Sequence, residues 1–372
     1  MSKPKLRIGY YCQIDVMKGI FAISLDFELH WGGFEKWPLS IPDFKSQISD
    51  SDRQPNGGKF LTVDKKDYAN YFLNTRQVIP KMLKLFADHE VHVTWATVGM
   101  LFHPTRNQLL EYAPEFKPEY IHKELSAYHY IQEQGIGEDE SADPFHFAPS
   151  LIRQIVATPH QELATHTFSH YYCNETGQNA EQFRADLKAA QKSARLFSRE
   201  LKSLVFPRNQ FNDKYLRVCF EEGITSVRSN PLDWFWRIQS TQSESLWKRL
   251  NRGLDAYFPV GKQNTFPIAS LKKRSGFPLA IPASRLLRPY NPRESVLNRL
   301  KIDRICHEMT RAAKSGQIYH LWWHPHNFGA FPEESLKGLA EVLSNYDFCK
   351  SSHGMESLSM SEISDRVATS NL

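Results

Sequence analysis

The chain alternates between short apolar runs and longer helical patterns, and this alternation constrains its fold more than any other feature. Residues 91–97 form an apolar run rich in β-branched side chains, whereas residues 180–202 repeat apolar side chains at three- and four-residue steps. The first pattern predicts a buried strand and the second an amphipathic helix. Strands that alternate with helices predict an α/β fold with a mostly parallel sheet, either open or closed into a barrel.

The same reasoning predicts further elements along the chain. The expected strands cover residues 19–25, 91–97, 162–165, 203–206, 224–227 and 317–322. The expected helices cover residues 75–87, 180–202, 213–222 and 295–314, and Asn179 with Gln182 can form a capping box. Two polar segments, about 32–67 and 103–149, are too long for simple connections, so we expect them to be loop insertions after the first and second strands. We expect residues 1–372 to form a single domain.

Composition excludes several classes of protein. Hydrophobic residues make up 41% and charged residues 23% of the 372, which excludes a wholly disordered chain. A net charge of +5 is too small for a dedicated nucleic-acid binder. No apolar run reaches the roughly 18 residues of a membrane span, and the N-terminus lacks the apolar run of a secretory signal, so we expect a cytoplasmic protein. The five cysteines include no CxxC pair and are expected to be free thiols.

An acidic pair stands at the end of the first expected strand. Side chains at i and i+2 share one face of a strand, so Asp26 and Glu28 should face the same space. Carboxylates at the end of an apolar strand are costly unless positive charge or solvent meets them. A solvated strand end explains this pair as well as a functional site does.

Two histidines follow the 162–165 strand. His166 and His170 are spaced i, i+4 and can lie on one face of a helical turn, from which both can reach a metal. A packed histidine pair is the more common explanation of such spacing. Together with one carboxylate, however, two imidazoles with open positions suit zinc, cobalt, nickel or iron. Asp26 would then be available as a base.

Other polar residues follow the later strands. Arg208 follows the 203–206 strand, Asp233 and Trp234 follow the 224–227 strand, and His324 ends the 317–322 strand. Each has an ordinary structural explanation on its own, but their shared position at strand ends favours a common site. Trp31 belongs to an aromatic cluster, which suits contact with the face of a sugar and suits a hydrophobic core equally well.

These motifs together resemble a known family. Leu25-Asp-Phe-Glu28, His166-Thr-Phe-Ser-His170, Arg208-Asn-Gln-Phe211, Asp233-Trp234 and His324-Pro325 occur in the order seen in polysaccharide deacetylases. These are the chitooligosaccharide-deacetylase-like proteins of carbohydrate esterase family four. The resemblance covers residues 19 to 330, and Asp-Phe-Glu is similar to an Asp-x-Glu subgroup. It implies a distorted (β/α) barrel, expected to have seven strands, with the site at the strand C-terminal ends.

The resemblance also implies roles for individual residues. It implies that Asp26 is the catalytic base and His324 the catalytic acid. It also implies that Arg208 tethers the base, and that the Asp–Trp pair which tunes the acid is Asp233 and Trp234. The implied metal ligands are Glu28, His166 and His170, and the implied backbone N–H donor to the oxyanion is that of Phe211. His326 competes with His324 for the role of acid.

The implied function is a metal-dependent hydrolase that removes an acyl group, in the first instance N-acetyl, from a sugar. We expect zinc as the metal and an acetamido-sugar precursor of a surface polysaccharide as the substrate. The substrate could be diphosphate-linked, because the segment 271–304, with Arg285 and Arg288, is strongly basic. A solvated basic face explains that segment equally well.

Four alternatives stay open at this stage. A related amidohydrolase, similar to allantoinases, would cut a C–N bond outside sugars. A glycosidase would use two carboxylates and no histidine ligands, and a two-histidine oxygenase would consume oxygen. An inactive carbohydrate-binding relative would retain the fold alone. The sequence does not indicate an oligomeric state.

Overall fold

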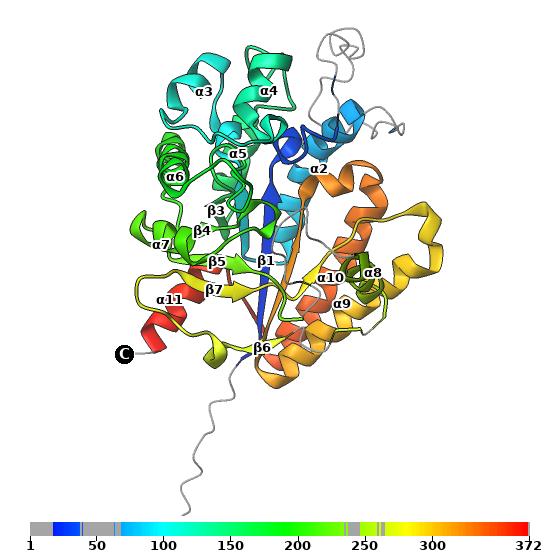
Figure 1. Ribbon diagram of the computed structural model, residues 1–372. Helices are drawn as coiled ribbons and strands as arrows, with labels where there is room; N and C mark the ends of the chain where they lie inside the picture. The colour runs from blue at the N-terminus through cyan, green and yellow to red at the C-terminus, as the bar shows by residue number, and fades with distance from the viewer. Residues whose placement is uncertain are drawn as a thin grey trace, which may run out of the picture.

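The chain is seen in a computed structural model that describes residues 18–37, 39, 63, 68–233, 236, 246–258, 260–261 and 265–370. A parallel sheet runs through its centre (Figure 1). The strands of this sheet, in spatial order, are β9 (Gln317–Trp323), β1 (Ile20–Phe27), β2 (Val93–Thr97), β3 (Gln161–Thr165), β4 (Ser203–Leu204) and β5 (Ser226–Ser229). Their carboxyl ends therefore lie at one edge of the sheet.

One bent segment connects the two sides of this sheet. Its first part, β7 (Leu279–Pro282), pairs in parallel with β5, and its second part, β8 (Arg285–Leu286), pairs in parallel with β9. Ser284 lies between them and donates its backbone N–H to the His320 carbonyl at 2.7 Å. Counted with this segment, the sheet closes as a distorted barrel with seven strand positions, which confirms the expected fold class. Two short strands add to its edges, β6 (Phe266–Pro267) antiparallel to β9 and β10 (Glu356–Ser357) parallel to β1.

Helices cover the outside of the barrel (Figure 1). They are α2 (Tyr68–Asp88), α5 (Pro149–Ala157), α6 (Ala180–Ala194), α7 (Asp213–Glu221), α8 (Leu246–Asp255), α9 (Ser295–Ser315), α10 (Pro332–His353) and α11 (Met360–Ser370). The predicted capping box of Asn179 and Gln182 starts α6, and Gly316 ends α9 in the left-handed conformation. Within the described ranges, no helix combines the length and apolarity needed to cross a bilayer.

Strand β1 shows how the sequence separates the core from the site. All eight of its residues are buried, as expected for a parallel strand covered on both faces. The odd-numbered side chains from Phe21 to Phe27 join the main core cluster with residues of α2 and α10. The even-numbered side chains Ser24 and Asp26 point to the opposite face, the barrel interior. The strand period of two thus carries a carboxylate into the interior.

Three predicted boundaries need comment. The helix expected over 180–202 ends earlier: α6 stops at Ala194, a short 3-10 turn (Arg195–Phe197) follows, and Ser198 is left-handed with φ 54°. The 103–149 insertion contains two short helices, α3 (Arg106–Tyr112) and α4 (Ala127–Gln134). Figure 1 shows both helices toward the end of the barrel where β1 ends. Most of the 32–67 insertion lies outside the described residues.

Gly329 fixes the turn after β9 against α2. An added Cβ at Gly329 would approach the Tyr71 carbonyl oxygen to 2.1 Å and the Thr75 hydroxyl oxygen to 2.8 Å. Asn74 donates its side-chain amide N–H to the Gly329 carbonyl at 2.9 Å. This close approach holds the short helix η10 (Pro325–Gly329) in place, and with it the end of β9.

We predict that Gly329→Ala lowers the free energy of unfolding by about 1–3 kcal/mol, because the backbone of η10 must move away from α2. Urea denaturation followed by circular dichroism measures this change. Gly253→Ala is the matched control: an added Cβ at this position in α8 meets no atom within 4 Å. Since alanine favours a helix by roughly 0.5–1 kcal/mol over glycine, the control should be neutral or stabilised. Equal losses in both variants would contradict the packing argument.

Candidate active site

Polar side chains from several strand ends meet at one end of the barrel interior. Asp26 and Glu28 come from the end of β1, and His166 and His170 follow β3. His324 follows β9. The structure therefore brings together the acidic pair, the histidine pair and the late histidine that the sequence placed at separate strand ends.

Glu28, His166 and His170 form a compact group of potential metal ligands. One ligand atom of each residue lies within 4.8 Å of the others, and all three residues are buried. Both imidazoles direct Nε2 toward the same oxygen, Glu28 Oε2, at 3.3 Å for His166 and 2.9 Å for His170. His170 Nδ1 contacts the Tyr172 hydroxyl at 3.0 Å, which leaves Nε2 for a metal. Two imidazole nitrogens and one carboxylate form a donor set that fits a divalent cation such as zinc.

The segment that carries both histidines is an irregular turn rather than the expected helical turn. Thr167 and His170 adopt left-handed backbone conformations, with φ of 65° and 56°. Such conformations are costly for residues with side chains and persist where surrounding contacts hold them. Here the buried Asp186 of α6 accepts hydrogen bonds from the backbone N–H groups of Phe168 at 2.6 Å and Ser169 at 3.1 Å. These bonds place both histidines beside Glu28 despite the unfavourable turn.

Asp26 is held by Arg228 and not by Arg208, which corrects the expected tether. Arg228 donates from its two terminal nitrogens to Asp26 Oδ1 at 2.6 Å and Oδ2 at 2.7 Å. Both side chains are buried, and the guanidinium carbon lies 4.3 Å from the centre of the Trp322 ring. Planar guanidinium and carboxylate groups match in such two-bond pairs, so the orientation of Asp26 is defined.

The surroundings favour the ionised form of both carboxyl groups. Burial is the largest single influence and raises the pKa of Asp26. The charges of Arg228, His324 and His166, together with the hydrogen bond from Arg228, outweigh burial and hold that pKa below its ordinary value. Burial likewise raises the pKa of Glu28, but His324 and hydrogen bonds from His166 and His170 bring it well below its ordinary value. Asp26 is therefore poised as a proton acceptor.

Arg208 lies beside Tyr172, whose hydroxyl contacts His170. It forms an ion pair with Glu35, and its guanidinium carbon lies 4.2 Å from the centre of the Tyr172 ring. Its backbone is left-handed with φ 52°. The ring of Phe211 packs on Phe206, and the oxyanion role of the Phe211 backbone N–H stays a prediction.

The two histidines after β9 occupy different environments. His324 Nε2 lies 3.6 Å from Asp26 Oδ2 and 3.4 Å from Glu28 Oε1, and its side chain is 27% exposed. His326 is buried, with Nδ1 3.9 Å from Glu28 Oε1. Burial and the charge of His324 lower the pKa of His326 to about 3, so His326 is neutral at neutral pH. Of the two, His324 is the better placed to exchange a proton with a substrate.

The remaining candidates are placed as follows. Trp31 is fully buried and donates its indole N–H to the His146 carbonyl at 3.0 Å, so it supports the site from the core and the expected sugar contact is wrong. Asp233 lies against Gly261, where an added Cβ would approach its Oδ2 to 2.2 Å. Trp234 lies outside the described residues. Trp322, which the motifs did not single out, has its ring 5.8 Å from that of His324.

The basic segment 271–304 is partly used inside the fold. Arg285 is buried and donates to both carboxylate oxygens of Glu308 at 2.7 Å. Its third nitrogen donates to the Asp255 carbonyl at 2.6 Å. These ion pairs hold β8 against α9, so the expectation that Arg285 meets a diphosphate is wrong.

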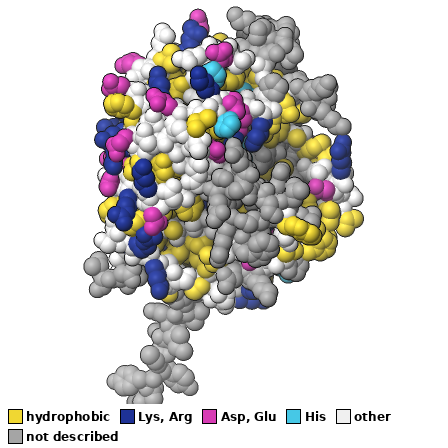
Figure 2. Space-filling model, viewed as in Figure 1, with side chains coloured by type: hydrophobic (Ala, Val, Ile, Leu, Met, Phe, Trp, Pro, Cys, Tyr) yellow, Lys and Arg dark blue, Asp and Glu magenta, His cyan; other side chains and the backbone are white. Residues whose placement is uncertain are grey.

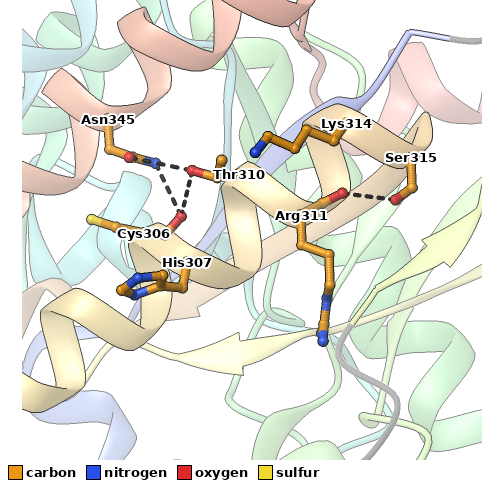
Figure 3. A pocket seen from close by; sticks show the side chains of 7 residues that line it. All are labelled: Cys306, His307, Thr310, Arg311, Lys314, Ser315 and Asn345. Atoms are coloured by element: carbon orange, nitrogen blue, oxygen red, sulfur yellow. Dashed lines mark hydrogen bonds between the residues drawn. The ribbon is translucent and has the colours of Figure 1, made fainter.

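Two surface features lie apart from the strand ends. A groove on the helical layer is lined by residues of α9 together with Asn345 of α10, and Figure 3 shows Cys306, His307 and Arg311 along it. On the face in Figure 2, basic and acidic side chains are mixed among one another. The groove contains none of the candidate site residues, which lie in the barrel interior.

Comparisons with known proteins found a family model that matches part of the chain. Residues 53–227 match the family model described as polysaccharide deacetylase. This part of the chain is therefore similar to polysaccharide deacetylases, and the resemblance seen in the motifs is confirmed. The matched range includes His166, His170 and Arg208 but ends one residue before Arg228. The family supports hydrolytic removal of an acyl group from a sugar.

The fold is supported by one solved structure with a TM-score above 0.5, and two further structures align less well. A putative polysaccharide deacetylase from Mycobacterium smegmatis aligns with a TM-score of 0.54 and 13% identity, covering 100% of this chain and 96% of that one. A probable polysaccharide deacetylase from Pseudomonas aeruginosa aligns at 0.49 with 11% identity and covers 93% and 89%. PuuE allantoinase aligns at 0.49 with 13% identity and covers 98% and 97%. A search of curated proteins found no match.

We predict that Arg228→Met lowers the free energy of unfolding by about 3–5 kcal/mol, because it leaves the Asp26 charge buried without a partner. Adding Asp26→Asn should recover part of this loss, since the buried charge is then removed. Chemical denaturation of both single variants and the double variant measures the coupling. Arg274→Met, in the exposed pair with Asp213, is the control and should cost at most about 1 kcal/mol. A double variant no more stable than Arg228→Met would contradict the pairing.

Proposed function

We propose that the protein is a metal-dependent hydrolase that removes an N-acetyl group from an acetamido sugar. One observation carries this proposal: the Glu28–His166–His170 group lies next to an ionised carboxylate and a partly exposed imidazole. That imidazole belongs to His324, whose Nε2 lies between the two carboxylates, 3.4 Å from Glu28 Oε1 and 3.6 Å from Asp26 Oδ2. A ligand group, a base and an acid within one interior are what hydrolysis of an amide requires.

Glu28, His166 and His170 would hold the metal through one carboxylate oxygen and two Nε2 atoms. We propose zinc, with cobalt, nickel or iron as alternatives of the same donor preference. When bound, such an ion supplies Lewis acidity toward an acyl oxygen and toward water. The Tyr172 hydroxyl beside His170 Nδ1 keeps that ring oriented for binding.

Asp26 is proposed as the general base. Its lowered pKa keeps it ionised at neutral pH, so it can take a proton from the attacking water. Arg228 holds both carboxylate oxygens and thereby limits how far Asp26 can rotate. Asp26 and Arg228 thus act as a unit, in which only Asp26 meets the reacting water.

His324 is proposed as the general acid, which gives a proton to the departing amine. General acid catalysis typically contributes roughly 10²–10⁴ in rate. The proposed oxyanion donor is the Phe211 backbone N–H; such a donor is worth on the order of 3 kcal/mol. Asp233 and Trp234 remain proposed as residues that tune the acid, with Trp322 as a further neighbour of His324.

The proposed substrate is a precursor of a surface polysaccharide, deacetylated in the cytoplasm. A diphosphate-linked sugar fits this role only if residues other than Arg285 meet the diphosphate, because Arg285 is committed to Glu308. Arg288 is the remaining candidate of the two arginines first considered.

We predict that Asp26→Asn abolishes acetate release from acetamido sugars while retaining about one metal per chain, because Asp26 is a base and not a ligand. His170→Ala should lose both metal and activity, because it removes a ligand nitrogen. Elemental mass spectrometry after dialysis against zinc measures the metal, and acetate release from a panel of acetamido sugars measures turnover.

His307→Ala is the control for loss of an imidazole, since His307 is exposed on the outer surface of α9. It should keep both metal and activity. Undiminished acetate release by Asp26→Asn would contradict the base assignment. Release of product from non-sugar amides alone would favour the related amidohydrolase, and absence of metal in folded wild type would favour a carbohydrate-binding relative or a glycosidase.

A further inference from the structure

We propose that the Glu35–Arg208 ion pair recognises ring hydroxyl groups of the substrate, with Glu35 accepting from one hydroxyl and Arg208 donating to an adjacent hydroxyl oxygen. This inference rests on the proposed function and names the residues that would contact the hydroxyl groups of the sugar. Neither residue has a role in the proton transfers above. Both residues lie near the candidate ligand His170.

The pair adjoins the candidate metal ligands through Tyr172. The Arg208 guanidinium carbon lies 4.2 Å from the centre of the Tyr172 ring, and the Tyr172 hydroxyl lies 3.0 Å from His170 Nδ1. Burial raises the pKa of Tyr172 and the negative charge of Glu35 raises it further, which agrees with this proximity. A substrate with its acyl group at the metal ligands would therefore extend beside this pair.

Glu35 has an unused acceptor. Its side chain is 8% exposed, and its Oε1 meets Arg208 and, at 3.7 Å, Lys36 Nζ. Its Oε2 is buried and has no hydrogen-bond partner among the described residues. A buried carboxylate oxygen without a donor is costly, so an incoming hydroxyl that donates to it would be favoured.

Arg208 is held in place at a conformational cost. Arg208 and Asn209 are consecutive left-handed residues, with φ of 52° and 53°. Asn209 is linked to the Asp26–Arg228 pair, because Arg228 donates to the Asn209 side-chain oxygen at 3.3 Å. Strained backbone that is held by surrounding contacts is typical of positions where a side chain must point in a particular direction. The guanidinium has five N–H donors, so the pair with Glu35 leaves others for a ligand.

The charges of the pair select among ligand chemistries. An anionic substituent would be attracted by Arg208 but repelled by Glu35. A cationic substituent would be attracted by Glu35 but repelled by Arg208. A hydroxyl group is neutral and can donate to Glu35 and accept from Arg208. Adjacent hydroxyls on a sugar ring satisfy both partners at once.

Binding in the Asp26→Asn background tests this inference without turnover. The probes are N-acetylglucosamine and N-cyclohexylacetamide, which carry the same acetamido group on a six-membered ring with and without hydroxyls. Isothermal titration of the zinc-loaded protein gives the ratio of their dissociation constants. We expect Glu35→Gln, added to Asp26→Asn, to reduce the preference for the sugar roughly tenfold to a hundredfold, the range for one hydrogen bond to a charged group. Arg208→Lys should reduce it in the same direction.

Glu222→Gln is the matched control, because Glu222 pairs with Arg184 on the outer helices at 2.8 Å. It should leave the ratio unchanged. If Glu35→Gln leaves the ratio of dissociation constants unchanged, including by weakening the binding of both probes equally, the pair is only structural and the inference is overturned. Bound zinc and the melting temperature report separately on folding. A preserved sugar preference in Asp26→Asn together with no acetate release by wild type would overturn the proposed function but support the hydroxyl-binding pair.

Discussion

The buried ion pair between Asp26 and Arg228 is the interaction on which the site depends. It connects β1 to β5 across the barrel interior, and the guanidinium also contacts Ser24 and the ring of Trp322. A buried carboxylate is expensive unless a well-oriented partner meets it, so the two residues must be placed together. The same arginine reaches Asn209 and thereby links the base to the loop that presents Arg208.

The turn after β3 shows a second constraint, between local backbone preference and tertiary support. Thr167 and His170 adopt left-handed conformations that their side chains disfavour, and Asp186 of the neighbouring helix supplies the hydrogen-bond acceptors that stabilise the turn. After β9, Gly329 allows η10 to approach α2 closely. Histidines from both sides of the barrel can therefore reach one carboxylate.

Local patterns predicted much of the fold. The apolar run before Asp26, the β-branched run ending near Gly99 and the capping box at Asn179 each correspond to an observed element, because burial and capping act over a few residues. The closing segment 279–286 was not predicted. Its two strand portions are short and their partners, β5 and β9, lie far from each other in sequence. Long-range pairing of this kind has little local signature.

The sequence alone determined which residue types stand at the strand ends: the acidic pair of β1, the histidine pair after β3 and the histidine after β9. This was possible because side-chain alternation and strand boundaries depend on residues that are consecutive in the sequence. Only the tertiary structure decided which cation meets Asp26. Arg208 follows β4, and Arg228 lies in the neighbouring strand β5. In the structure Arg208 pairs with Glu35, whereas Arg228 pairs with Asp26. Trp31, similarly, is part of the core because the 103–149 insertion contacts it through His146, and this contact joins segments that are distant in sequence.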